Sequence, residues 1–179
     1  EIIKEVAEDV KIVYTPLHGT GNVPVRRVLE ELGFKNVYVV PEQEMPDPKF
    51  STLDYPNPED PKAFKMALDL ARKVNADVVL ATDPDADRLG IYALDTKSGE
   101  YIPFTGNMSG MLIADYIMRE KTALGTMPEN PALVKTIVTT NMADVIVKKF
   151  GVTWIEALTG FKYLGAQIKL LEQTTTYNY

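Results

Sequence analysis

The chain has 179 residues, of which 45% are hydrophobic and 25% charged, and its formal net charge is −6 at pH 7. This length allows one domain or two small ones. The acidic balance argues against a nucleic-acid-binding protein, which would normally present a basic face. The absence of cysteine excludes a disulfide framework and a zinc site built from thiolates. No apolar run approaches the roughly 20 residues that a membrane span needs, so we expect a cytoplasmic protein with no membrane partner.

Strands and helices alternate through the first 104 residues. Strands are predicted at 10–14, 36–40 and 77–81, helices at 24–32 and 61–74, and a hairpin at 89–94 and 100–104. Asn22 and Asp60 are the expected N-caps of the two helices. The apolar face of the second helix should consist of Phe64, Ala67, Leu68 and Ala71. Residues 41–61 form a long, proline-rich loop, and such a loop in a compact domain is typically functional or mobile.

A similar alternation follows from residue 105. Helices are predicted at 108–119, 142–150 and 160–171, and strands at 133–139 and 152–156. The first of these helices should turn four apolar side chains inward, namely Met111, Leu112, Ile113 and Tyr116. The sequence therefore predicts an α/β protein. It should consist of two small βαβ-type domains, residues 1–104 and 105–179, with mainly parallel mixed sheets flanked by helices.

Three carboxylates at alternate positions form the most informative motif. Asp83, Asp85 and Asp87 follow the apolar run 78–80, which is typical of a buried strand, and Arg88 comes next. Ligands of open α/β sheets bind at the carboxyl ends of the strands. Crowded carboxylates repel one another unless a cation lies among them, and a hard divalent ion such as Mg2+ prefers oxygen ligands. Because Arg88 adds a planar fork suited to phosphate, the motif predicts a metal-dependent phosphoryl-transfer site.

Other interpretations of this motif compete with that one. An ordinary solvated turn is possible, since Asp and Pro are common turn residues. A calcium EF-hand loop is excluded, because it needs Gly and Glu where Arg88 and Leu94 stand. A haloacid-dehalogenase-like phosphatase would use Asp83 as nucleophile and Asp85 as acid/base, but it usually has Thr or Val in place of Asp87. A glycosyltransferase Asp-x-Asp metal site would leave Asp87 and Arg88 unexplained.

Two further loops carry candidate binding residues. Residues 15–22 follow the first strand and open a helix, and Gly19 and Gly21 permit close approach of the backbone. His18 in this loop is the only histidine, and bracing the loop and transferring a proton are equally open roles for it. Residues 158–162 connect the last strand to the last helix. Their Thr, Gly and Lys are suited to a sugar hydroxyl or a phosphate, although spacing alone favours an ordinary capping turn.

Three segments together resemble the α-D-phosphohexomutases, the phosphoglucomutase and phosphomannomutase superfamily. They are residues 15–21 (Thr-Pro-Leu-His-Gly-Thr-Gly), 83–90 (Asp-Pro-Asp-Ala-Asp-Arg-Leu-Gly) and 159–162 (Thr-Gly-Phe-Lys), in the order and rough spacing of that family. The second segment is a specific signature, and the other two support it. Members of the family have four domains. The chain resembles the second of them over residues 1–104 and part of the third over residues 105–179.

The resemblance implies a role for each candidate residue. Asp83, Asp85 and Asp87 would hold Mg2+, with a phosphoserine as the fourth ligand. Arg88 would be a catalytic residue beside the same site, in contact with phosphate or sugar. The residues that bind the phosphorylated hexose substrate would be Thr159, Gly160, Lys162 and His18.

The resemblance also implies an activity and the parts that it needs. The complete enzyme would be an isomerase that interconverts hexose 1-phosphate and 6-phosphate through a phosphoserine. The serine loop of the first domain and the Gly-Glu-x-Ser loop of the third do not occur in this sequence, and nothing in it matches the fourth domain. We therefore expect an excised piece that is inactive without domains I and IV of the same chain. The alternatives are a phosphoglucosamine mutase or phosphopentomutase, a haloacid-dehalogenase-like phosphatase, and a silent binding domain.

Overall fold

The computed structural model describes residues 2–174, and side chains from residue 5 onward within that range. The chain divides into two compact units, Glu1–Gly106 and Asn107–Tyr179. Each unit is an α/β structure and is described by itself. Among the described residues, no helix is both long and apolar enough to cross a membrane.

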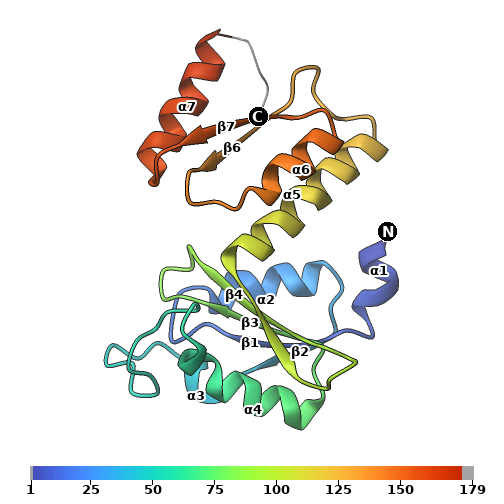
Figure 1. Cartoon of the computed structure of the whole chain (residues 1–179). Helices are drawn as coiled ribbons and strands as arrows, with labels where there is room; N and C mark the ends of the chain where they lie inside the picture. Colours follow the sequence, from blue (N-terminus) through green and yellow to red (C-terminus); the bar gives the residue numbers. More distant parts are fainter. Residues whose placement is uncertain (1, 175–179) are drawn as a thin grey trace. The chain divides into compact units, whose positions relative to one another are not determined.

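A five-stranded sheet forms the centre of the first unit (Figure 1). Its strands are β1 (Lys11–Thr15), β2 (Asn36–Val39), β3 (Val78–Thr82), β4 (Leu89–Leu94) and β5 (Tyr101–Phe104), in the order β2-β1-β3-β4-β5. β1 pairs in parallel with β2 and β3, whereas β4 is antiparallel to both β3 and β5. This mixed sheet confirms the predicted fold class, and the predicted hairpin forms one edge of it.

The helices of the first unit are α1 (Ile2–Ala7), α2 (Asn22–Glu31), α3 (Pro41–Glu44), the 3-10 helix η1 (Pro61–Phe64) and α4 (Lys65–Val74). α2 and α4 lie on opposite faces of the sheet (Figure 1). The predicted cap at Asp60 is confirmed, because its side chain accepts a hydrogen bond from the backbone N–H of Lys62 at 2.9 Å. The predicted cap at Asn22 is wrong. Gly21 is the N-cap of α2, and Asn22 Nδ2 donates to the carbonyl of Glu44 at 3.0 Å.

The core of the first unit lies between the sheet and α4. Phe64, Ala67 and Ala71 are buried there and Leu68 is half-buried, as predicted from their helical spacing. The ring of Phe64 packs on that of Tyr92 from β4, with 4.6 Å between the centroids. The remaining buried members of this cluster are Val13, Leu17, Val40, Ala63, Ala76, Val79 and Ala81. Because Val79 and Ala81 belong to β3, the strand that carries the acidic motif is fixed in a rigid core.

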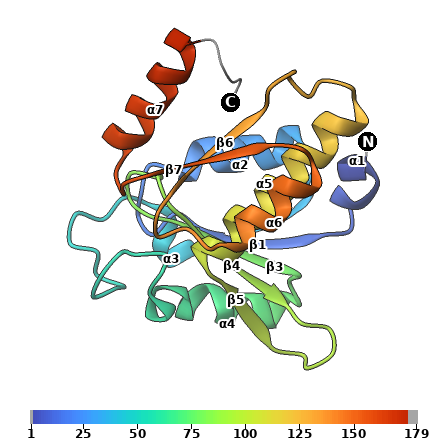
Figure 2. The ribbon, with the colours of Figure 1, turned by 45° about the horizontal axis from the view of Figure 1, so that its top comes forward.

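The second unit contains a two-stranded parallel sheet, whose strands lie side by side in Figure 2. Its elements are α5 (Gly106–Ala123), β6 (Ala132–Thr136), α6 (Met142–Lys149), β7 (Thr153–Ala157) and α7 (Phe161–Thr174). Four residues form its buried apolar cluster, namely Ala114, Met118, Val147 and Val152. Lys135 of β6 is also buried, and its ammonium pairs with Asp144 of α6 at 3.4 Å and Glu156 of β7 at 3.0 Å.

Two predictions for the second unit need correction. Strand β6 ends at Thr136 rather than at residue 139, because Thr139 N–H bonds back to the carbonyl of Thr136 at 2.9 Å and closes a turn. In α5 the buried residues are Met111, Ala114 and Met118, which share one face at i, i+3 and i+7. Met111 was predicted correctly. The three other side chains that were expected to be buried are at least half exposed, namely Leu112, Ile113 and Tyr116.

Candidate functional site

The acidic motif lies at the edge of the sheet where two parallel strands end. Thr15 at the end of β1 is the register neighbour of Ala81 near the end of β3. The loops that leave these strands, residues 16–21 and 83–88, therefore begin side by side. They also contact each other, since Thr20 N–H donates to the carbonyl of Pro84 at 2.8 Å. This is the position at which ligands bind in open α/β sheets.

The three aspartates of the motif come together. One carboxylate oxygen from each of Asp83, Asp85 and Asp87 lies within 4.8 Å of the others. Asp83 is buried and the other two are exposed. Between the exposed pair, Ala86 takes the left-handed conformation with φ of 60°, and its N–H bonds to the carbonyl of Asp83 at 3.0 Å. The chain thus turns sharply at Ala86, and carboxylates from alternate positions reach the same small volume.

Arg88 is tied to the buried member of this triad. Its backbone N–H donates to Asp83 Oδ1 at 3.0 Å and its Nε donates to Oδ2 at 2.7 Å. A third bond runs from its guanidinium to Oδ1 of Asn57 at 3.1 Å. The nearest oxygen of Asp87 lies 3.7 Å from the same Nε. Asp83 is therefore held in one orientation by charge-assisted hydrogen bonds, while Asp85 and Asp87 remain open to solvent.

The triad shows opposed shifts of pKa. Burial raises the pKa of Asp83, but the hydrogen bonds from the backbone and side chain of Arg88 outweigh it, so the pKa lies below its ordinary value. The pKa of Asp87 is raised, chiefly by the negative charge of Asp85, with burial and a hydrogen bond to Asp83 adding to it. The charge of Arg88 lowers the pKa of Asp87 only in part, so electrostatic repulsion within the triad outweighs it there. A divalent cation with a preference for oxygen fits this donor set, because it would relieve that repulsion.

Proton release on metal binding follows from these shifts. A cation among the carboxylates would lower the pKa of Asp87, which the neighbouring carboxylates raise. Affinity should therefore fall as the pH drops through that raised pKa, and the number of protons released per ion should decrease as the pH rises above it. Calorimetric titrations with Mn2+ in buffers of different ionisation enthalpy, from about pH 4 to pH 7, measure this release. Equal affinity throughout this range would contradict the expectation.

The loop 16–21 packs against the acidic loop through its glycines. A Cβ on Gly19 would lie 2.5 Å from Cα of Pro84. A Cβ on Gly21 would lie 2.5 Å from the hydroxyl of Thr82 and 2.6 Å from that of Tyr14, which bond to each other at 2.8 Å. The sequence predicted that the backbone at these glycines makes a close approach. In the structure both glycines approach other parts of the protein, namely the acidic loop and the side chains beneath it.

His18 lies in this loop and is buried, with a positive φ of 64°. Its Nδ1 donates to the carbonyl of Met45 at 2.8 Å, and its Nε2 bonds to the hydroxyl of Thr52 at 2.8 Å. Both ring nitrogens are therefore used to hold the long loop 41–61. Of the two roles left open by the sequence, these contacts favour bracing, and substrate binding by His18 stays a prediction.

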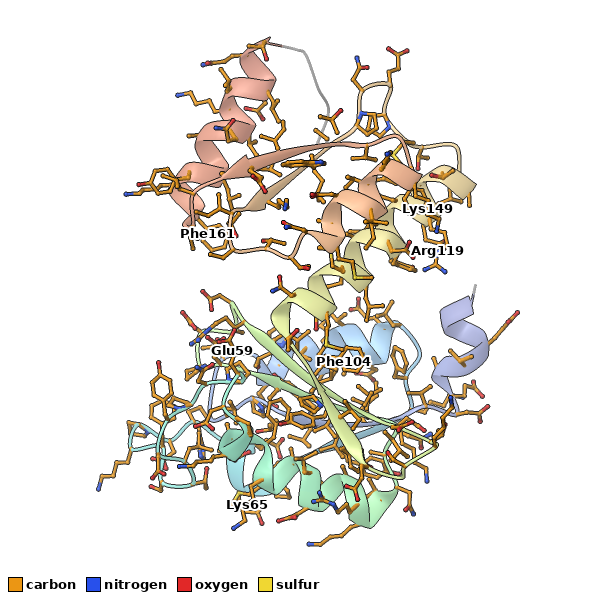
Figure 3. All side chains as sticks on the ribbon, in the orientation of Figure 1. Glu59, Lys65, Phe104, Arg119, Lys149 and Phe161 are labelled. Atoms are coloured by element: carbon orange, nitrogen blue, oxygen red, sulfur yellow. The ribbon has the colours of Figure 1, made fainter. Side chains whose placement is uncertain are left out.

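The remaining candidate residues lie in the second unit. Thr159 and Lys162 are exposed on either side of Gly160, which has a φ of 127°. Nζ of Lys162 lies 4.7 Å from the centre of the Tyr163 ring. Phe161, labelled in Figure 3, begins α7 and is 86% exposed. The structure therefore presents this loop to solvent at the carboxyl end of β7, while the acidic triad lies in the first unit.

Two residues that contact the site were not singled out from the sequence. Asn57 bonds to Arg88, and Thr20 bonds to Pro84. These contacts join positions 31 and 64 residues apart. No local pattern of sequence predicts such pairs. The only signals were the glycines around Thr20 and the unusual length of the loop that contains Asn57.

Comparison with known proteins places the chain in one family. Residues 1–96 match the phosphoglucomutase/phosphomannomutase alpha/beta/alpha domain II, and residues 105–176 match domain III. The chain therefore belongs to the phosphoglucomutase/phosphomannomutase family, as the three sequence motifs had indicated. It is 38% identical over 173 residues to a phosphoglucomutase of Staphylococcus epidermidis, covering 96% of this chain and 31% of that protein. The chain thus spans about a third of the length of the relatives it matches.

Solved structures share the fold of this chain. A phosphoglucomutase/phosphomannomutase family protein from Burkholderia thailandensis superposes with a TM-score of 0.68 at 19% identity, over 97% of this chain and 35% of that one. An Aspergillus fumigatus N-acetylphosphoglucosamine mutase, solved with GlcNAc-6P and magnesium, gives 0.55 at 18% identity, over 90% of this chain and 32% of that one. These similarities support the fold.

Proposed function

We propose that the chain is the metal-binding and part of the sugar-binding portion of a hexose phosphate mutase. The complete enzyme would interconvert hexose 1-phosphate and 6-phosphate by phosphoryl transfer through a phosphoserine. The observation that carries the proposal is the triad of Asp83, Asp85 and Asp87 with Arg88, in a chain of the phosphoglucomutase/phosphomannomutase family. Residues 1–104 would be domain II and residues 105–179 part of domain III.

The metal proposed for the triad is Mg2+. Hard oxygen ligands in a small volume suit this ion, and the A. fumigatus relative was solved with magnesium. Bound there, the ion would neutralise charge on phosphoryl oxygens. Asp83 would supply a ligand that stays ionised, because hydrogen bonds from Arg88 hold its pKa low. The guanidinium of Arg88 would contact the phosphoryl group beside the metal.

The loop at residues 159–162 would bind the phosphorylated sugar. The hydroxyl of Thr159 and the open backbone at Gly160 suit a sugar hydroxyl, and Lys162 suits a phosphate. Lys162 is the positively charged residue of this loop, because the residues on either side of the loop, Leu158 and Tyr163, are uncharged. His18 would contribute to substrate binding indirectly, by holding the loop 41–61 through both ring nitrogens. Domains I and IV of the same chain would supply the serine and the remaining phosphate contacts, so this portion alone should be inactive.

The complete protein of which this chain is part provides the test. Conversion of glucose 1-phosphate into glucose 6-phosphate, measured with a coupled dehydrogenase, should require Mg2+. Lys162→Met should raise KM by about tenfold or more, because a charged hydrogen bond to phosphate is lost. Lys169→Met serves as the control, because it removes an exposed lysine of the same helix α7 and should change nothing. Failure of the unsubstituted protein to isomerise any hexose phosphate would overturn the proposal.

A further inference from the structure

The long loop 41–61 is built as a framework beside the acidic motif. Its first turn is α3, and Gln43 there is fully buried. Gln43 accepts a hydrogen bond from the hydroxyl of Thr15 at 2.7 Å and donates to Thr52 at 3.2 Å. Thr52 in turn bonds to His18 at 2.8 Å. A continuous chain of buried and half-buried polar groups therefore fixes this loop to the end of β1.

The last part of the loop is fixed just as firmly to β4. The carbonyl of Pro58 approaches Gly90 so closely that a Cβ on that glycine would lie 2.2 Å away. Asn57 closes the turn, with its side-chain oxygen accepting from Glu59 N–H at 3.0 Å and its carbonyl accepting from Asp60 N–H at 3.0 Å. Glu59 marks this turn in Figure 3. The side-chain oxygen of Asn57 is therefore held at a fixed point.

That oxygen also accepts the hydrogen bond from the guanidinium of Arg88 at 3.1 Å. The guanidinium thus donates hydrogen bonds to two acceptors, Asn57 from the loop 41–61 and Asp83 from the acidic motif. Without the hydrogen bond to Asn57, the end of the Arg88 guanidinium can rotate towards Asp87, whose carboxylate is already 3.7 Å from Nε. An arginine paired with Asp87 competes with a metal ion for the same oxygen.

We propose that Asn57 is a positioning residue that holds the Arg88 guanidinium on Asp83, limits its pairing with Asp87 to the long contact of 3.7 Å, and so keeps the triad open to a cation. The effect on the cation rests on the function proposed above. The effect on Arg88 does not, because both hydrogen bonds join protein groups.

Two readouts on the present chain test the proposal. The first is the 15Nε–1Hε NMR signal of Arg88, assigned with Arg88→Lys. In Asn57→Ala this signal should lose its protection from exchange with water. The second is Mn2+ affinity by titration calorimetry, which should fall by about fivefold, the size of one ordinary net hydrogen bond. Asn57→Asp keeps an oxygen acceptor at the same point and should restore both readouts.

The matched control is Asp47→Ala, which removes a similar cap from the same loop. Asp47 accepts from Lys49 N–H at 2.9 Å and Ser51 N–H at 2.8 Å, and no contact joins it to Arg88 among the described interactions. Both readouts should be unchanged in this variant. An Arg88 signal that is the same in Asn57→Ala and the unsubstituted chain overturns the inference, as does an equal loss in Asp47→Ala. Absence of Mn2+ binding in the unsubstituted chain instead overturns the proposed function.

Discussion

Replacing Gly90 with alanine should destabilise the first unit by about 3 kcal/mol, at the upper end of what over-packing a core usually costs. The new Cβ would lie 2.2 Å from the carbonyl oxygen of Pro58 and 2.8 Å from the ring of Phe64. Neither neighbour moves easily, since one is backbone in a closed turn and the other is a fully buried side chain. Relief of the clash requires the loop 41–61 to move away from β4.

Thermal unfolding followed by far-ultraviolet circular dichroism measures this loss. The control is Gly106→Ala at the start of α5, where an added Cβ meets no atom within 4 Å. That variant should be as stable as the unsubstituted chain. A melting temperature for Gly90→Ala equal to that of the control would show that the turn at Pro58 is not packed on β4 as described.

Asp85→Asn should weaken Mg2+ and Mn2+ binding by more than about 100-fold. Loss of an outer partner that only orients a ligand typically costs about 10–100-fold in metal affinity, and loss of a direct ligand costs more. Asparagine keeps the size of the side chain but removes the charge. The fold should survive, because Asp85 is exposed. The same change should lower the pKa of Asp87 towards its ordinary value, since the charge of Asp85 is the main cause of its rise.

The control for this variant is Asp54→Asn, which makes the same change of charge at an exposed position outside the triad. Titration calorimetry on both variants compares their affinities directly. A large loss in Asp54→Asn would show that net charge, rather than the triad, sets the affinity. Unchanged binding by Asp85→Asn would remove this residue from the metal site.

The sequence predicted the first unit well, because its patterns are local. A continuous apolar run gave β3, and the alternation of acids after it placed three carboxylates at the carboxyl end of a buried strand. Asp60 before Pro61 marked the start of a helix, because its side chain caps the backbone N–H of Lys62 only two residues away. Such features depend on periodicity and capping, which can be read without knowing the fold.

The errors arose where local pattern is ambiguous. In α5 apolar residues occur at 108, 111–114 and 116–118, so more than one face satisfies helical spacing. The packed face was Met111, Ala114 and Met118, which local pattern alone does not decide. The β-branched run at 136–139 favoured a strand, but the hydrogen bond between Thr139 and Thr136 ends it in a turn.

The supports of the site were equally hidden from the sequence. The bond between Asn57 and Arg88 exists only because the turn at residues 57–60 packs on β4. The contacts of His18 likewise depend on where the loop 41–61 lies. Such pairings are set by tertiary structure, so the motif reveals the acids while the fold reveals what orients them.

The most direct test of the central claim is a crystal of this chain grown with Mn2+ and measured near the manganese absorption edge. We expect an anomalous peak among the carboxylates of Asp83, Asp85 and Asp87, and no such peak in crystals of Asp85→Asn. An anomalous map with no peak at the triad, or with manganese bound only at other carboxylates, would contradict the assignment of this loop as the metal site.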